Sequence, residues 1–169
     1  ETTNATELRK NLKRKLDFVS KDRETIIIHR SGEEDIIMLP ISEYNSWKET
    51  MYLVSSKANR KNLEKSIEQA GNGDTERIEI DEFGSSLYQE SPQRAPILEE
   101  IRKQGHPKAH IGLLNAILEN PYTGIGKPEP LRENLSGYWS RRITQEHRLV
   151  YKIDEEKDTL IVISIRFHY

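Results

Sequence analysis

Residues 138–169 decide the fold class of the C-terminal half, and they read YWSRRITQEHRLVYKIDEEKDTLIVISIRFHY. Three runs rich in β-branched and aromatic residues are separated by the short polar connections QE and DEEKD. Runs of this kind, joined by turns of two to five residues, predict neighbouring antiparallel strands. Upstream of the glycine- and proline-rich loop at 121–137, residues 107–119 carry apolar side chains at helical spacing. Short helices followed by three antiparallel strands predict an α+β domain.

The first half of the chain shows a different alternation of helices and strands. Asn4 and Glu7 have the spacing of a capping box, and leucines recur every four residues through a helix expected over about residues 5–20. The isoleucine-rich runs ETIIIHR and EDIIMLP flank Ser31 and Gly32, which predicts a β-hairpin. Two further helices are expected over about residues 42–54 and 57–70.

The strongest signal for a domain boundary is GNGDT at residues 71–75, where two glycines, an asparagine and an aspartate come together. We therefore expect two domains, residues 1–75 and 76–169, the second of which opens with the short strand candidate RIEID. Residues 84–108 hold three of the seven prolines and fit neither domain pattern. They are a tail, a linker or a helix of the second domain, and the sequence leaves these alternatives open.

Composition excludes several classes of protein. The 169 residues include 26 basic and 28 acidic side chains, 34% hydrophobic residues and no cysteine. The absence of cysteine rules out disulfides, thiolate zinc sites and cysteine nucleophiles. No apolar run approaches the roughly 18 residues that span a bilayer, and residues 1–15 lack the apolar core of a signal peptide. These features predict a soluble cytoplasmic protein without a membrane partner.

A basic run near the N-terminus has two interpretations. Five cations fall within seven positions, and they are Arg9, Lys10, Lys13, Arg14 and Lys15. Such a run is either a solvated helix face or an element that contacts nucleic-acid phosphates. Composition alone does not choose between the two.

The C-terminal third concentrates side chains suited to metal-free RNA cleavage: one carboxylate, two histidines, five arginines and a terminal tyrosine. They are Glu129, Arg132, Arg141, Arg142, His147, Arg148, Arg166, His168 and Tyr169. A carboxylate or imidazole can take the proton of a 2′-hydroxyl, guanidiniums can stabilise the phosphorane, and an imidazole can return a proton to the leaving oxygen. Each residue also has a structural interpretation, as a solvated loop residue, a cross-strand ion pair or a frayed tail. The sequence contains no metal-ligand spacing, nucleophile elbow or phosphate-binding glycine loop, so we expect no metal and no cofactor.

The segments KPEPL, NLSGYWSRRI, EHRLVY and the terminal HY give residues 111–169 an order and spacing that resembles the YoeB-type toxins of the RelE superfamily. The resemblance implies a microbial-RNase-like fold and a ribosome-dependent endonuclease that cuts mRNA in the ribosomal A site. It implies Glu129 as the general base, Arg148 as the residue that stabilises the phosphate, and His168 as the general acid. Tyr169 would complete the site. The basic positions expected to hold RNA are Arg132, Arg141 and Arg142.

The first 75 residues resemble another family, the YefM/Phd-type antitoxins, in TELRKNL and in the stretch from IIIHRSGEEDIIMLP to NRKNLEKSI. The resemblance implies a domain that forms homodimers or higher oligomers, binds operator DNA, represses its own operon and covers a cognate toxin with its tail. Arg9 and Arg30 match the family's DNA-contacting arginines. The residues then expected to contact DNA phosphates are Lys10, Lys13 and Arg14.

The two resemblances predict a Phd/YefM-like antitoxin domain followed by a RelE/YoeB-like toxin domain, although the two families are normally separate polypeptides. The leading hypothesis is a toxin–antitoxin protein that combines DNA binding with a translation-inhibiting endoribonuclease, inhibited at least in part by the antitoxin half. The alternative is a transcriptional autorepressor whose silenced toxin half acts only as corepressor. A plain interaction module is a third hypothesis, and the intact set of catalytic residue types argues against it. If RIEID is the first strand of the toxin, little antitoxin tail remains to cover the active site.

Overall fold

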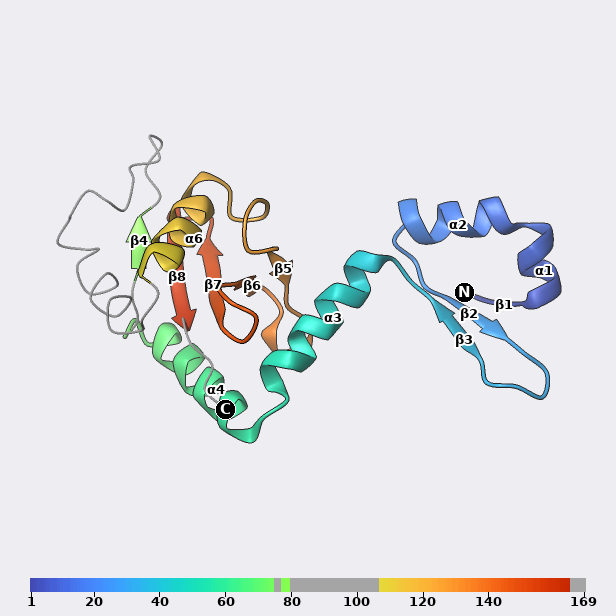
Figure 1. Cartoon of the computed structure of the whole chain (residues 1–169), viewed down its shortest axis with the longest axis horizontal. Helices are drawn as coiled ribbons and strands as arrows, with labels where there is room; N and C mark the ends of the chain where they lie inside the picture. The colour runs from blue at the N-terminus through green and yellow to red at the C-terminus, as the bar shows by residue number, and fades with distance from the viewer. Residues whose placement is uncertain (75–76, 80–106, 165–169) are drawn as a thin grey trace. The chain divides into compact units, whose positions relative to one another are not determined.

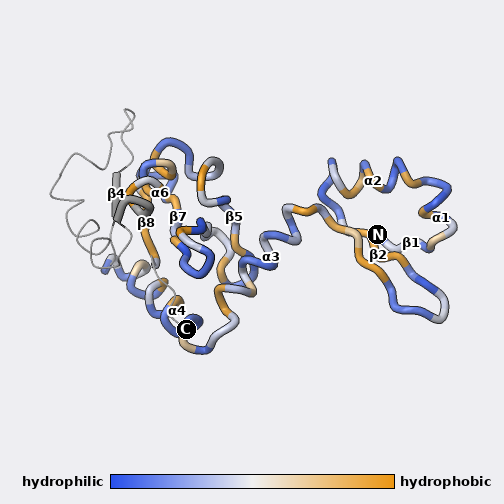
Figure 2. The backbone as a smooth tube through the Cα atoms, viewed as in Figure 1, coloured by the Kyte–Doolittle hydropathy of each residue, from blue (hydrophilic) through white to orange (hydrophobic). Residues whose placement is uncertain are grey.

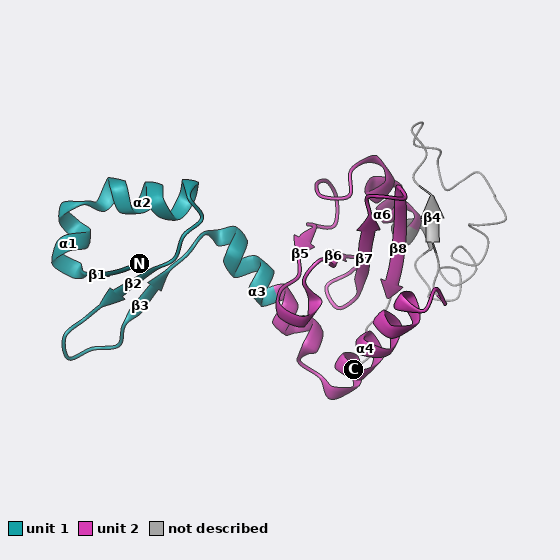
Figure 3. Ribbon diagram, turned by 180° about the vertical axis from the view of Figure 1, so that it is seen from behind, with its two compact units in different colours: residues 1–48 teal, residues 49–169 magenta. Residues whose placement is uncertain are grey.

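The computed structural model describes residues 1–74, 77–79 and 107–164 of the chain (Figure 1). The chain divides into two compact units, residues 1–48 and residues 49–169 (Figure 3). The division falls inside helix α3 (Ile41–Val54), well before the boundary that the GNGDT sequence predicts. Composition therefore marks where helices end, whereas the compact units depend on which helices pack on which sheet.

The N-terminal unit is built on a three-stranded sheet in the order β1-β2-β3, crossed by two short helices. Its elements are β1 (Thr2–Asn4), α1 (Ala5–Lys10), α2 (Leu12–Lys21), β2 (Ile26–His29) and β3 (Ile36–Met38). β2 and β3 pair antiparallel with Ile26 opposite Met38, which confirms the predicted hairpin. β1 pairs parallel with β2, and no signal in the sequence predicts it because three residues are too short to show a strand period.

The single helix expected over residues 5–20 is wrong, because the structure breaks it at Asn11. The Asn4 side chain caps α1 as predicted, accepting the Glu7 backbone N–H at 2.9 Å. The Glu7 carboxylate does not return to Asn4; it accepts instead from the Asn11 side-chain amide at 2.5 Å. Asn11 leaves helical geometry (φ −118°, ψ 26°), as expected of a residue whose side chain competes locally for hydrogen bonds.

The N-terminal unit has a small core and leaves much apolar surface uncovered. Val19, Ile26 and Ile28 are buried. Figure 2 shows the hydrophobic colouring along β2 and β3, where several large side chains are nevertheless exposed. The large hydrophobic residues exposed in this unit are Leu12, Leu16, Ile27, Ile36, Ile37, Ile41, Tyr44 and Trp47. A surface of this kind is typical of a domain that associates with another copy or another protein.

The C-terminal unit contains a five-stranded antiparallel sheet in the order β4-β8-β7-β6-β5. Its strands are β4 (Arg77–Glu79), β5 (Glu129–Pro130), β6 (Trp139–Arg142), β7 (Arg148–Asp154) and β8 (Thr159–Ser164). The three strands predicted at the C-terminus and the RIEID strand are confirmed within the described residues, as is the α+β class. Glu129 differs from its predicted place in a loop, because it begins β5 and pairs with Ser140 of β6.

Helices cover both faces of this sheet, which explains why β8 reads TLIVIS without polar alternation and why Leu149, Val150 and Tyr151 of β7 are all buried. The helices that the structure describes in this unit are α6 (Pro107–Glu119), the second half of α3, α4 (Lys57–Gly71) and the short 3₁₀ turn η1 (Glu133–Leu135). Successive strand residues alternate between faces, so Leu149 and Tyr151 of β7 pack with α6, whereas Val150 packs on the other side. The second cluster joins Leu53 of α3 and Leu63 of α4 to the sheet. Residues 49–71 therefore supply one of the two layers on the sheet.

The helices predicted over about residues 42–54, 57–70 and 107–119 are confirmed as α3, α4 and α6, with bounds that agree to within one residue. α4 is capped by Ser56, which accepts the Asn59 N–H at 3.4 Å, and the left-handed Gly73 (φ 83°) follows its last turn. Among the described residues, no helix is both long and apolar enough to cross a membrane.

Candidate functional site

Strand pairing brings the predicted catalytic residue types onto one face of the sheet. Glu129 lies opposite Ser140, and Arg142 lies opposite Arg148, across β5, β6 and β7. Since strand residues two apart share a face, Ser140 and Arg142 point to the same side. That side is the one covered by the second half of α3, as the contacts of Glu49 show. The structure thus gathers a carboxylate, a hydroxyl and two guanidiniums beneath one helix.

The Glu49 carboxylate of α3 lies against this group, and Glu49 is only 4% exposed. Its Oε1 accepts from Arg148 Nε at 2.5 Å and from the Ser140 hydroxyl at 2.8 Å. Its Oε2 lies 3.9 Å from Arg142 Nη2, which is an ion pair without a normal hydrogen bond. Nothing in the sequence around NSWKET distinguishes Glu49 from a solvated helix residue, so sequence reasoning missed it.

Arg148 is held on every side by protein groups and is 5% exposed. Its Nη1 donates to the backbone carbonyls of Thr144 at 3.2 Å and Gln145 at 3.1 Å. The guanidinium carbon lies 4.5 Å from the centre of the Tyr52 ring, a cation–π arrangement. The Tyr52 hydroxyl in turn donates to the carbonyl of Glu146 at 2.8 Å. The second half of α3 therefore supplies both a carboxylate and an aromatic ring to this arginine.

Glu129 is half-buried beside these charges. Burial and the nearby Glu49 carboxylate raise the pKa of Glu129 above its ordinary value, while Arg142 and Lys127 act in the opposite direction. A carboxylate with a raised pKa is a better proton acceptor than an ordinary solvated glutamate. The electrostatics thus favour the role in proton transfer predicted for Glu129.

The tight turn before β5 fixes the position of Glu129, the first residue of that strand. Gly126 has a φ of 80°, and a Cβ there would lie 2.5 Å from the Leu113 side chain and 3.2 Å from the Arg141 Cβ. Its carbonyl accepts the Arg142 N–H at 2.7 Å, which ties the turn to β6. Only glycine fits this position without a shift of the surrounding chain.

Arg141 is among the residues predicted to bind RNA, but the structure places it in the interior, on the face of β6 opposite to Ser140 and Arg142. It is fully buried, and its guanidinium donates to the carbonyls of the loop that precedes Gly126. Those bonds run to Asn120 at 2.6 Å, Thr123 at 2.7 Å and Ile125 at 3.0 Å, with a further bond to the Tyr151 hydroxyl at 3.2 Å. Its position next to Arg142 on a strand already implies that the two point to opposite faces.

The remaining predicted residues of the site lie at its rim or outside the described residues. Arg142 keeps 44% of its side chain exposed. Arg132 is half-buried, and its backbone N–H donates to the Thr50 hydroxyl at 2.9 Å. His168 and Tyr169 lie outside the described residues, as does Arg166.

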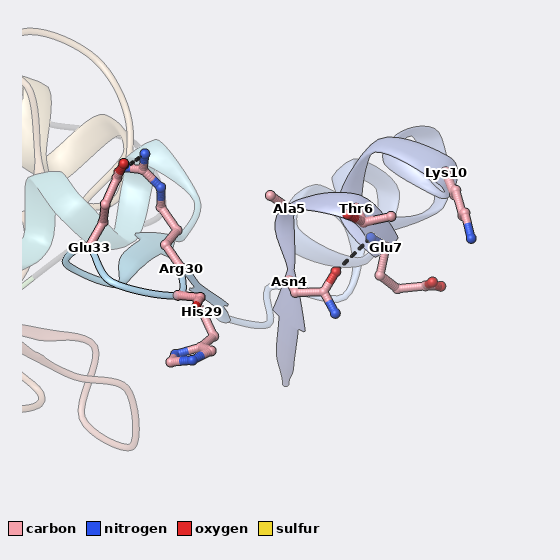
Figure 4. Close-up of a pocket in the computed structure, with 9 residues that line it drawn as sticks. Asn4, Ala5, Thr6, Glu7, Lys10, His29, Arg30 and Glu33 are labelled. Carbon is pink, nitrogen blue, oxygen red and sulfur yellow. Dashed lines mark hydrogen bonds and ion pairs between the residues drawn. The ribbon is translucent and has the colours of Figure 1, made fainter.

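The cations predicted to bind DNA lie in the N-terminal unit, and most of them are exposed. The exposed ones are Arg9, Lys10, Lys13 and Arg14, and Arg30 is half-buried. Lys15 of the same basic run, which is not one of the predicted DNA contacts, is buried and paired with Glu1. An open groove in this unit is lined by residues of α1 and of the β2–β3 turn, including Asn4, Lys10 and Arg30 (Figure 4). Arg30 forms an ion pair with Glu33 at the edge of this groove. A contact between Arg30 and DNA would therefore compete with Glu33.

No group of three potential metal ligands lies together among residues 1–74, 77–79 and 107–164. The chemistry available to the described part of the site is that of a carboxylate, a hydroxyl and guanidiniums.

Comparison with known families separates the chain into two segments. Residues 1–73 match the antitoxin Phd_YefM family of type II toxin–antitoxin systems, and residues 104–169 match the family of YoeB-like toxins of bacterial type II toxin–antitoxin systems. The curated protein Toxin YoeB of a Synechocystis species is 63% identical over 57 residues, which are 34% of this chain and 64% of that protein. Antitoxin YefM of the same species is 32% identical over 68 residues, 40% of this chain and 78% of that protein.

The toxin match is partial, because the chain spans slightly less than two thirds of the length of the curated toxins that it matches. Toxin YoeB of Escherichia coli, for example, is 53% identical over 57 residues, which are 66% of that protein. Among solved structures, the YoeB-YefM complex from Staphylococcus aureus is 40% identical, and the alignment covers 47% of this chain and 92% of that chain with a TM-score of 0.39.

The division between the matched families does not coincide with the division between the compact units. Residues 49–73 match the antitoxin family, yet they pack in the unit whose strands match the toxin family. Glu49 and Tyr52, which contact Arg148, belong to this antitoxin-matching segment.

Proposed function

The chain belongs to the Phd/YefM antitoxin family over residues 1–73 and to the YoeB-like toxin family over residues 104–169, and on that premise we propose a combined function. The N-terminal unit binds operator DNA and represses its own transcription. The toxin segment is a ribosome-dependent endonuclease that cuts mRNA in the ribosomal A site. In the conformation described here the nuclease is inhibited, because antitoxin residues cover the face that carries its candidate catalytic groups.

The proposed cleavage needs no metal. Glu129 takes the proton of the 2′-hydroxyl, whose oxygen attacks the adjacent phosphorus. Arg148 and Arg142 stabilise the negative charge of the phosphorane. The bond from phosphorus to the 5′-oxygen then breaks, and His168 protonates that oxygen while Tyr169 completes the site. The products are a 2′,3′-cyclic phosphate and a 5′-hydroxyl.

The single observation that supports this chemistry best is the grouping of Glu129, Arg142 and Arg148 on one face of three adjacent strands. The raised pKa of Glu129 supports its part as the base. Arg132, half-buried after β5, is the proposed additional contact to RNA, together with Arg142. The interior position of Arg141 leads us to omit it from the RNA-binding set.

The proposed DNA contacts are Arg30 at the hairpin and four exposed cations of α1 and α2, namely Arg9, Lys10, Lys13 and Arg14. Counterion release from DNA favours the binding of such exposed cations. The uncovered apolar surface of the N-terminal unit supports assembly into a homodimer or a higher oligomer. The second candidate function, an autorepressor with a silent toxin half, is favoured by the contact of Glu49 with Arg148. It differs from the first only in whether the nuclease is ever released.

A cut between α4 and β4 tests the proposed function. A protease site placed in GNGDT allows the purified chain to be cleaved, diluted and added to a cell-free translation reaction, with mRNA ends mapped by primer extension. We expect A-site cuts from the cleaved chain, few from the uncut chain and none from a cleaved Glu129→Gln chain. If the cleaved and diluted chain leaves mRNA intact, the nuclease is excluded and the autorepressor remains.

A further inference from the structure

Glu49 presents to Arg148 the same chemistry as an RNA phosphate. A phosphate offers anionic oxygens that accept charge-assisted hydrogen bonds from guanidinium and hydroxyl donors. The Glu49 carboxylate does so in the structure, with Oε1 on both Arg148 Nε and the Ser140 hydroxyl and Oε2 facing the partly exposed Arg142. Two guanidiniums and a hydroxyl directed at one anion form a built anion-binding site.

We propose that Glu49 occupies the position of the scissile phosphate, so that the antitoxin segment inhibits the nuclease by substrate mimicry within the same chain. The proposal rests on the proposed function, since it takes Arg148 as the group that contacts the RNA phosphate. Arg148 Nε has one hydrogen, and its acceptor is Glu49. RNA gains this donor only when the Glu49 carboxylate leaves.

Neighbouring residues of α3 hold Glu49 in place. The Thr50 hydroxyl accepts the Arg132 N–H, and the Tyr52 ring covers the Arg148 guanidinium. Leu53, one turn after Glu49, is fully buried against the sheet. Leu53 thus anchors the helix beside Glu49, Tyr52 covers the arginine that Glu49 binds, and Thr50 accepts a hydrogen bond from the backbone of Arg132.

The contribution of α4 to the same layer is different in kind. Its buried residues are Leu63, Ala70 and Asn59, and none of them carries a charge. Glu64 and Glu68 of α4 are exposed. The anion that α3 and α4 bring to Arg148 is therefore Glu49, so a change confined to Glu49 separates inhibition from packing.

The test compares full-length chains carrying Glu49→Gln, Glu49→Ala or the matched control Glu64→Gln. The glutamine keeps an oxygen that can accept from Arg148 and Ser140 while it removes the charge, so the fold is retained. The alanine removes the competing group altogether. Binding is measured by fluorescence anisotropy with a short single-stranded RNA whose 2′-positions are methylated, so that it cannot be cleaved. Circular dichroism melting confirms that each variant is folded.

We expect Glu49→Ala to bind this RNA at least about tenfold more tightly than the parent, Glu49→Gln to fall between them, and Glu64→Gln to match the parent. RNA bound to the basic N-terminal helices would contribute equally to all four proteins. Adding Arg148→Ala to Glu49→Ala should abolish the gain, because the gain arises at this arginine.

The outcomes separate this inference from the proposed function. Tighter binding together with A-site cleavage by Glu49→Ala supports both. Tighter binding that depends on Arg148, without cleavage, supports mimicry at an anion site and excludes the nuclease. Unchanged binding by folded Glu49→Gln and Glu49→Ala chains overturns the inference, whatever the cleaved parent chain does to mRNA.

Discussion

The two compact units use the same kind of side chain in opposite ways. In the N-terminal unit the arginines of α1 and α2, Arg9 and Arg14, are exposed. In the C-terminal unit Arg141 and Arg148 are buried and bonded to protein acceptors. The difference teaches that the number of arginines does not by itself indicate nucleic-acid binding. An arginine is available to bind a nucleic acid only if no protein group already holds its guanidinium.

The energetics of the two settings differ accordingly. Exposed cations bind polyanions through counterion release, and salt weakens that binding. A buried guanidinium depends on its partners, and removal of one partner from a buried pair costs about 3–5 kcal/mol. The predictions below test this contrast, beginning with the change expected to have the largest effect.

Replacing Arg141 by alanine should lower the free energy of unfolding of the C-terminal unit by about 3–5 kcal/mol, because several loop carbonyls lose their donor. Arg142→Ala, at the neighbouring exposed position, should cost less than about 1 kcal/mol. Urea denaturation followed by the fluorescence of Trp139, with Trp47→Phe to remove the other tryptophan, measures both. Equal losses for the two variants would contradict the assignment of Arg141 to the interior.

In a chain activated by Glu49→Ala, replacing Arg148 by alanine should lower the single-turnover cleavage rate of ribosome-bound mRNA by about 10²–10³-fold, as loss of a charge-stabilising donor does. Glu129→Gln should lower the rate by about 10²–10⁴-fold. Lys157→Ala, an exposed cation in the β7–β8 turn, serves as the control and should cleave at the parental rate. A rate that Arg148→Ala leaves unchanged would rule out its role at the phosphate.

On the other side of the comparison, Arg9→Ala should weaken binding to duplex DNA from upstream of the coding region by about 1–3 kcal/mol, roughly 5- to 150-fold. Its side chain is exposed, so the melting temperature should not change. The parent complex should weaken with salt by about 0.9 logarithmic units per phosphate neutralised. Lys61→Ala, exposed on α4, is the matched control. Salt-insensitive binding, or normal binding by Arg9→Ala, would place the DNA contact elsewhere.

The smallest effect concerns Glu129 and pH. Since the fold raises the pKa of Glu129, folding favours its protonated form and the ionised form destabilises the protein. This cost is absent below the ordinary value of 4.5 and is fully present above the raised value. Glu129→Gln should therefore melt higher than the parent at pH 7, by no more than about 2 °C, and equally with it below pH 4.5. A lower melting temperature of the variant at pH 7 would reverse the sign and refute this account of Glu129.

Much of the fold could be predicted from local patterns, because apolar runs and turn residues report directly on strands and hairpins. The break at Asn11 could not, since it depends on a side-chain bond to Glu7 rather than on hydrophobic period. Strand alternation already separates Arg141 from Arg142, so the interior position of Arg141 was accessible to closer reading. The role of Glu49 could not be predicted from the sequence, because its partner Arg148 lies 99 residues away and only packing joins them.

The domain boundary shows the same limit. GNGDT marks the end of α4, and the antitoxin family match ends at residue 73. The compact units nevertheless divide at residue 48, because Leu53 and Leu63 pack on the five-stranded sheet of the C-terminal unit. Linker composition identifies a junction in the chain and carries no information about which side the preceding helices pack on.

Chemical modification of arginine tests the contrast between the two units most directly. The full chain is treated with phenylglyoxal, and the rate of modification at each arginine is followed by peptide mass spectrometry. In the parent, Arg9 and Arg14 should react quickly, while Arg141 and Arg148 stay protected. In Glu49→Ala, Arg148 alone of the protected pair should become reactive. Modification of Arg148 in the parent at the rate of Arg9 would contradict the claim that the antitoxin segment holds this arginine.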